Sequence, residues 1–161
     1  MPSTVQPKPV TANYKNATIL IAEANEDQWR LIQEAIRQQL PTVKAVQASS
    51  LPQAMKLLEG WRQQEWDMAK LLLLDPHLPQ LTDGWHLLRW MKAMSASIRQ
   101  IPVVVLSYSE AQADINEAYQ LGASSYLVKP TELADWLTCL GALRAYWWET
   151  VTLPPVHYGF E

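Results

Sequence analysis

Several features that mark other classes of protein are scarce or absent in this chain of 161 residues. Its single cysteine, Cys139, excludes an internal disulfide and suits a reducing compartment. The apolar residues around Cys139 indicate a packed thiol rather than a nucleophile. No apolar run approaches the ~18 residues that a membrane-spanning helix needs. The N-terminus has no charged region followed by an apolar core, so we expect no secretory signal and a cytoplasmic location.

Charge and histidine spacing exclude further classes. A formal net charge of −3 argues against a surface that binds nucleic acid. His77, His86 and His157 do not have the spacing of metal ligands. Gly-rich phosphate loops and a Ser-His-Asp order are also absent. We therefore expect neither nucleic acid nor a membrane as a partner.

The most informative segment is the run of four leucines at residues 71–74, which ends in Asp75. Such a run predicts a strand that is buried on both faces. Ligands of open parallel sheets bind at the carboxyl ends of the strands. Asp75 is therefore expected where a carboxylate can meet solvent, a metal and a small substrate. An aspartate that only starts a turn is the alternative.

Three other predicted strands lead into polar residues in the same way. Residues 18–22 lead into Glu23, residues 101–106 into Ser107, and residues 124–128 into Lys129. If the strands are parallel, these side chains meet Asp75 at one edge of the sheet. A carboxylate can attack a phosphoryl group, and a neighbouring acid can help to hold Mg²⁺. A hydroxyl and an amine can bind the phosphoryl oxygens.

Strand and helix patterns alternate along the chain. A further strand is predicted at residues 44–48, and helices at 26–40, 53–64, from 83 onward, 110–121 and 131–148. Ser49 and Ser50 are the candidates to cap the second helix, and Gly122 is expected to end the fourth. Five strands that alternate with five helices predict a three-layer α/β sandwich with right-handed crossovers. Residues 1–16 are expected to form a flexible leader, 17–147 one domain and 148–161 a C-terminal extension.

The order and spacing of these residues resemble the receiver domain of bacterial two-component response regulators over about residues 17–147. The resemblance implies a doubly wound, flavodoxin-like parallel sheet with the strand order 2-1-3-4-5. It implies that Asp75 is the phosphoacceptor, Ser107 the switch hydroxyl and Lys129 the lysine typical of the family. Tyr126 matches the rotating aromatic residue of the fifth strand. Pro130 matches a proline that usually follows a cis peptide in the family, which sequence alone does not establish.

One position departs from the family pattern. Receivers generally carry two adjacent acids after the first strand, whereas this chain has Glu23 followed by Ala24. The second acid is usually a direct Mg²⁺ ligand in the family. The resemblance therefore implies a weakened Mg²⁺ site formed by Asp75, the backbone carbonyl of His77, waters and Glu23.

The resemblance implies a single-domain response regulator that receives a phosphoryl group from a histidine kinase. Such a protein is not a classical enzyme, and at most transfers or removes its own phosphoryl group. Residues 147–155 resemble the C-terminal extension of regulators that are paired with phytochromes, so a phytochrome is the expected kinase. Two alternatives stay open. Ala24 favours a degenerate receiver that acts only as an interaction module, and the size of the sheet also suits a flavodoxin-like flavin carrier.

The last predicted helix carries two apolar stripes. Leu133, Leu137 and Leu140 form one stripe that we expect to face the sheet. The second stripe adds Trp136, Leu143 and Trp147 at the same spacing. A helix that is apolar around so much of its circumference predicts a homodimer through this helix and the C-terminal extension. The alternative is that the tail folds back over the second stripe within one chain.

Overall fold

The computed structural model describes residues 17–64 and 68–148, in which five strands form one parallel sheet. The strand order is β2-β1-β3-β4-β5, which confirms the expected order. The strands are β1 (Thr18–Ala22), β2 (Lys44–Ala48), β3 (Leu71–Leu74), β4 (Val103–Ser107) and β5 (Ser125–Val128).

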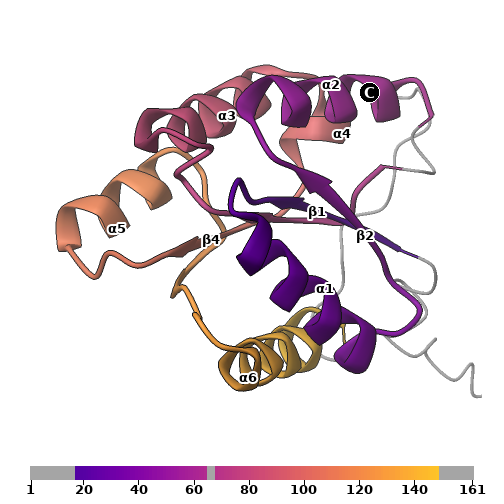
Figure 1. Ribbon diagram of the computed structural model, residues 1–161. Helices are drawn as coiled ribbons and strands as arrows, with labels where there is room; N and C mark the ends of the chain where they lie inside the picture. The colour runs from indigo at the N-terminus through magenta and orange to yellow at the C-terminus, as the bar shows by residue number, and fades with distance from the viewer. Residues whose placement is uncertain (1–16, 65–67, 149–161) are drawn as a thin grey trace, which may run out of the picture.

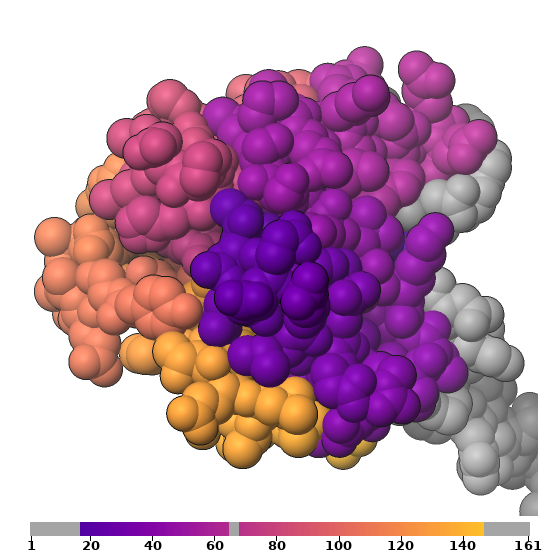
Figure 2. All heavy atoms as spheres, in the orientation of Figure 1, coloured from indigo at the N-terminus to yellow at the C-terminus, as the bar shows by residue number. Residues whose placement is uncertain are grey.

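Helices cover both faces of the sheet and make the three predicted layers (Figure 1). They are α1 (Glu26–Gln39), α2 (Leu51–Arg62), α3 (Leu81–Ala93), α4 (Ala96–Arg99), α5 (Gln112–Gln120) and α6 (Leu133–Leu143), followed by the π-helical turn η3 (Arg144–Trp148). Helices α1 and α6 pack on one face, and Figure 2 shows their atoms directly against one another. Helices α2 and α3 cover the other face.

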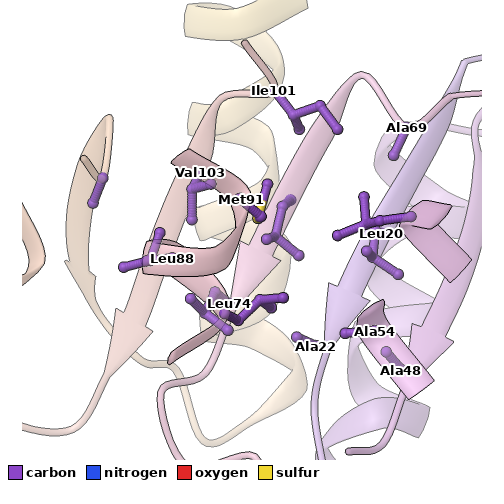
Figure 3. Close-up of a cluster of buried hydrophobic side chains, with 14 of the residues drawn as sticks. Leu20, Ala22, Ala48, Ala54, Ala69, Leu74, Leu88, Met91, Ile101 and Val103 are labelled. Atoms are coloured by element: carbon purple, nitrogen blue, oxygen red, sulfur yellow. The ribbon is translucent and has the colours of Figure 1, made fainter. Parts of the chain in front are cut away.

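The central strands divide their side chains between two hydrophobic cores. In β3, Leu71 and Leu73 pack against α1 and α6, whereas Leu72 and Leu74 face α2 and α3. All four leucines are buried, as the sequence predicted. Figure 3 shows the α2–α3 core, where Leu20 of β1 and Leu74 point into a cluster that also contains Leu88 and Met91 of α3. Alternation with a period of two in strands buried on both faces therefore fixes the sheet between the two helix layers.

The helix boundaries differ from the predicted ones by two residues at the starts of α2, α3, α5 and α6 and at the end of α2. Helix α2 begins at Leu51 because the side chain of Ser50 accepts a hydrogen bond from the amide of Gln53. Helix α3 begins at Leu81, where the carboxylate of Asp83 accepts a hydrogen bond of 3.0 Å from the amide of Gln80. The four-residue helix α4 was not predicted.

The ends of α5 and of the last helix lie close to the predicted positions. Gly122 follows α5 with a φ of 103°, a conformation that favours glycine, so its predicted role as a helix stop is confirmed. The last helix reaches Trp148 as predicted, but it is α-helical only to Leu143 and then becomes the π-helical turn. The predicted leader and residues 149–161 of the predicted extension lie outside the described residues.

The predicted orientation of α6 is wrong. Trp136, Leu140 and Leu143 are the buried residues of the helix, whereas Leu133 and Leu137 are only half-buried. The large ring of Trp136 is completely buried, and its Nε1 donates a hydrogen bond of 3.0 Å to the side chain of Gln28 on α1. This polar partner lets the indole lie inside. Trp136, Leu140 and Leu143 of the stripe on which the dimer prediction rested therefore belong to the core of one chain.

Cys139 is half-buried on α6, as its apolar surroundings predicted. Burial raises the pKa of the thiol to about 11, which agrees with a packed rather than a nucleophilic cysteine. Within residues 17–64 and 68–148, no helix has the length and apolar character to cross a bilayer.

Gly84 sets how closely α3 approaches the loop after β3. Its amide donates a hydrogen bond of 2.9 Å to the carbonyl of Pro76, and a Cβ at Gly84 would lie 2.3 Å from the Cα of Pro76. We predict that Gly84→Ala destabilises the protein by about 1–3 kcal/mol, because backbone atoms cannot yield to the methyl group. Urea unfolding measures the change.

Gly60→Ala is the matched control, since a Cβ at this exposed position of α2 meets nothing within 4 Å. The higher helix propensity of alanine should stabilise this variant by about 0.5–1 kcal/mol. A Gly84→Ala variant as stable as Gly60→Ala would contradict the predicted clash.

Candidate functional site

Three of the four polar residues predicted at the strand ends are in direct contact. Lys129 follows β5 and forms ion pairs with Glu23, which follows β1, and with Asp75, which follows β3. The distance from Lys129 Nζ to Asp75 Oδ2 is 2.5 Å. The parallel sheet brings these ends together, because β1 and β3 are neighbours and Asp75 donates its amide to the carbonyl of Ala22.

Ser107 lies beside this trio at the end of β4 and is buried. Its carbonyl accepts a hydrogen bond of 2.9 Å from the amide of Lys129, so the two residues are joined through the backbone. Its hydroxyl accepts a hydrogen bond of 3.1 Å from the amide of Ser109. The structure therefore places Ser107 at the predicted edge, with its hydroxyl engaged in the β4–α5 loop.

The ion pairs are almost completely buried, with exposed fractions of 2% for Glu23, 8% for Asp75 and 5% for Lys129. Burial raises the pKa of Glu23, and the hydrogen bond and charge of Lys129 offset this only in part. Burial lowers the pKa of Lys129, but the two carboxylates outweigh burial, so the pKa of the amine is raised. The amine is therefore held as a cation between two acids.

Asp75 is also oriented from its other side. Its Oδ1 accepts a hydrogen bond of 2.9 Å from the amide of His77. The imidazole of His77 is largely exposed, and its Nδ1 lies 3.6 Å from the same oxygen. Asp75 thus presents one oxygen to the ammonium and one to the loop that follows β3.

A pocket of about 470 Å³ opens onto Asp75 and Lys129. Its other lining residues come from the β1–α1 region and from the loops after β3 and β4: Glu23, Ala24, Asn25, Gln28, His77, Pro79 and Tyr108. Tyr108 was not predicted as a site residue. The signal in the sequence was an aromatic residue directly after the predicted switch hydroxyl.

The predicted switch residues Ser107 and Tyr126 are linked through Ser109. The hydroxyl of Tyr126 donates a hydrogen bond of 2.7 Å to the carbonyl of Ser109, whose amide is bonded to Ser107. The hydroxyl of Ser109 donates to Asp114 at the start of α5 over 2.5 Å. Hydrogen bonds therefore connect the site to the first turn of α5.

The peptide before Pro130, which the family resemblance associates with a cis bond, is not cis in this structure. Among the described residues the cis peptide bond is Leu78–Pro79, in the loop after Asp75.

The donor set agrees with a divalent cation that keeps most of its own waters. Glu23 and Asp75 supply two carboxylates, whereas Ala24 lines the pocket without a donor in its side chain. No group of three or more acidic, histidine or cysteine side chains suited to a metal occurs in the part of the chain that the structure describes. Mg²⁺ commonly binds through one or two carboxylates and completes its shell with water and phosphate oxygens. The residues therefore fit Mg²⁺ better than a metal that needs a full set of protein ligands.

Comparisons with known proteins agree with this geometry. The family model of the response regulator receiver domain matches residues 19–140. The response regulator Rcp1 of Synechocystis sp. is 32% identical over 139 residues, which cover 84% of this chain and 92% of Rcp1.

Two solved structures show the same likeness. The phosphorylated cyanobacterial phytochrome response regulator RcpA has a TM-score of 0.75 and 31% identity, and the match covers 86% of this chain and 99% of RcpA. The Mn²⁺-bound form of Rcp1 has a TM-score of 0.72 and 31% identity, with 86% of this chain and 99% of the other covered.

We predict that removing the ammonium of Lys129 destabilises the protein in a pH-dependent way. Lys129→Met leaves Glu23 and Asp75 buried without their partner, which should cost about 3–5 kcal/mol at about pH 7.5 in EDTA. The pKa of Glu23 in the folded state is already raised, and it rises further without the ammonium. A group whose pKa is raised in the folded state contributes to the free energy of unfolding at low pH, and this contribution is lost as the pH increases. The deficit of the variant should therefore shrink toward about pH 5.

Urea unfolding at both pH values measures this deficit. Lys70→Met is the control, because Lys70 is a half-buried lysine whose pKa is lowered by burial alone. A deficit of Lys129→Met that is equal at the two pH values would contradict the predicted role of the carboxylates.

Proposed function

Since this chain belongs to the family of response regulator receiver domains, we propose that Asp75 accepts a phosphoryl group from a histidine kinase. The observation that carries the proposal is the pairing of Asp75 with the buried ammonium of Lys129 at the mouth of the pocket. The chain acts as a single-domain response regulator in a two-component system.

The chemistry needs positioning and charge rather than a strong protein nucleophile. An oxygen of Asp75 attacks the phosphorus, and the bond between phosphorus and the imidazole nitrogen of the kinase breaks. The hydrogen bond from the amide of His77 holds the carboxylate in one orientation during this step. Lys129 would bind a phosphoryl oxygen once the phosphoryl group lies beside its ammonium.

Charge in the pocket supports a divalent cation as cofactor. Two carboxylates and one ammonium leave an excess of negative charge, and a phosphoryl group adds to it. Bound Mg²⁺ would supply positive charge to the phosphoryl oxygens. Glu23, Asp75 and the backbone carbonyl of His77 would hold it, together with waters, and Ala24 makes the site weaker than one with a third carboxylate.

A conformational response follows from the same hydrogen bonds. When the hydroxyl of Ser107 turns toward a phosphoryl oxygen, it releases the amide of Ser109. Ser109 also holds Tyr126 and Asp114, so the change reaches β5 and the start of α5. Ser107 and Tyr126 would thus shift the population of a two-state surface around these elements.

The kinase that we propose is a phytochrome, because the similar protein RcpA is a phytochrome response regulator. The protein would act in the cytoplasm and bind no nucleic acid. The homodimer stays a prediction, and its interface cannot use Trp136, Leu140 or Leu143, which lie in the core. Membership of the receiver family favours a phosphoacceptor over a flavin carrier.

A degenerate receiver that binds partners without phosphate is the second candidate function, and Ala24 is the observation that favours it. The two candidates differ in whether the protein forms a phosphoaspartate.

We predict that the full chain gains the mass of one phosphoryl group in acetyl phosphate and Mg²⁺, and that Asp75→Asn does not. The amide is a poor nucleophile and loses the charge that pairs with Lys129. Intact-mass spectrometry measures the adduct. Asp27→Asn, at an exposed acid that does not line the pocket, should be phosphorylated like the natural chain. No adduct on the natural chain at high Mg²⁺ would favour the degenerate receiver.

A second prediction concerns the missing acid. Ala24→Asp should tighten Mg²⁺ binding by about tenfold, or ~1.4 kcal/mol, because the cation gains a carboxylate ligand. Ala24→Asn is the matched control, since it adds a side chain of similar size without the charge. Titration calorimetry measures both affinities. Equal affinities of Ala24→Asp and the natural chain would mean that position 24 does not face the cation.

A further inference from the structure

Tyr108 combines high exposure with contact to a buried cation. Its ring centroid lies 5.1 Å from Nζ of Lys129, within the range of a cation–π interaction. The tyrosine is 55% exposed, whereas the lysine is 5% exposed. The proposed phosphoacceptor chemistry gives this exposed ring no role.

The ammonium of Lys129 is surrounded by groups of two kinds. Glu23 and Asp75 contact it through their carboxylates, and the ring of Tyr108 lies over it. Tyr108 is the exposed residue of this set, so its ring is the group that can shield the ammonium from solvent. Its π face also attracts the cation and restricts where the flexible lysine side chain can lie.

The same ring lines the pocket onto which Asp75 opens. A phosphoryl group on Asp75 would share the pocket with this ring. An aromatic face fills space that water could otherwise occupy, and it offers no strong hydrogen bond to hold a water molecule for attack. The position of the ring therefore affects which molecules reach the phosphorus.

The backbone on the C-terminal side of Tyr108 is fixed in place. The amide of Ser109 donates a hydrogen bond to the hydroxyl of Ser107. The carbonyl of Ser109 accepts a hydrogen bond from the hydroxyl of Tyr126. The hydroxyl of Ser109 is bonded to Asp114. The contacts with Tyr126 and Asp114 do not involve Ser107, so they hold the backbone next to Tyr108 even when the Ser107 hydroxyl turns away.

We propose that Tyr108 is a positioning residue that prolongs the phosphorylated state, an inference that rests on the proposed function of Asp75. Its ring holds the ammonium of Lys129 and restricts the access of water to the phosphoryl group. In the hydrolysis that it slows, a water oxygen bonds to phosphorus and the bond from phosphorus to the Asp75 oxygen breaks. The products are the free carboxylate and inorganic phosphate, which carries the protons of the water.

The test compares Tyr108→Ala, which removes the ring, with Tyr108→Phe, which keeps it. Each full chain is phosphorylated with acetyl phosphate and Mg²⁺, freed of donor, and followed by intact mass. We expect Tyr108→Ala to lose the phosphoryl group about fivefold faster than the natural chain, and Tyr108→Phe to match the natural chain. Tyr119→Ala, which alters a tyrosine of similar exposure outside the pocket, should also match it.

The rates at which Tyr108→Ala gains and loses the phosphoryl group distinguish a covering role of the ring from a displaced Lys129. Removing a cover should speed the reaction with acetyl phosphate as well as hydrolysis, because both reactants enter through the pocket. A Tyr108→Ala variant that is slower in both directions would have a displaced Lys129 and would overturn the covering role. Equal lifetimes in all variants would overturn the proposal as a whole.

A second measurement needs no phosphorylation. The unphosphorylated chains are treated with an amine-acetylating reagent, and modification of Lys129 is compared with that of Lys70 in the same sample by peptide mass spectrometry. Lys129 should be acetylated about fivefold faster in Tyr108→Ala than in Tyr108→Phe. If the natural chain forms no phosphoaspartate, the proposed function fails while this result still decides whether Tyr108 covers the lysine. Equal acetylation in the two variants would contradict the covering role.

Discussion

The site depends on one interaction, in which a single buried ammonium is the shared partner of two buried carboxylates. Lys129 lies between Glu23 and Asp75, and all three groups are at most 8% exposed. Removing Lys129 leaves two carboxylates without their counter-charge in a region of low dielectric, where an unpaired charge is costly. The loops after β1, β3 and β5 are therefore held in register by electrostatics at the same edge where the backbone pairs the strands. Stability and the proposed chemistry use the same three side chains.

The two hydrophobic cores let the sheet tolerate this charged edge. Leu71 and Leu73 pack against the α1–α6 layer, and Leu72 and Leu74 pack against the α2–α3 layer. Strand β3 is therefore fixed on both faces up to the residue before Asp75. Close contact of Gly84 with Pro76 then holds the start of α3 against the next loop. The rigid scaffold confines the side chain of Asp75, whereas the exposed imidazole of His77 is free of such packing. A well-oriented carboxylate is what phosphoryl transfer requires, since positioning supplies most of its catalysis.

The sequence predicted the sheet order and the contact between Asp75, Glu23 and Lys129, because buried strands that end in polar residues leave few arrangements in a parallel sheet. It did not predict which face of α6 is buried. Helix α6 carries apolar residues over most of its circumference. The face that is buried includes Trp136, which donates a hydrogen bond to Gln28, 108 positions earlier in the chain. Tyr108 was missed for a related reason, since its partner Lys129 belongs to another strand end. Patterns along the chain reveal periodicity, but contacts between distant side chains appear only in three dimensions.

Ala24 and Tyr108 both bear on the role of the Lys129 ammonium at this edge of the sheet. A receiver with two adjacent acids holds more negative charge at this edge and relies more on a divalent cation to offset it. In this chain Ala24 removes one such charge, so Lys129 neutralises a larger share of what remains. A phosphoryl group bound there would depend correspondingly more on where the ammonium lies. Under the proposed role of Tyr108, its ring restricts the position of the ammonium, which suits a site where Ala24 stands in place of a second acid.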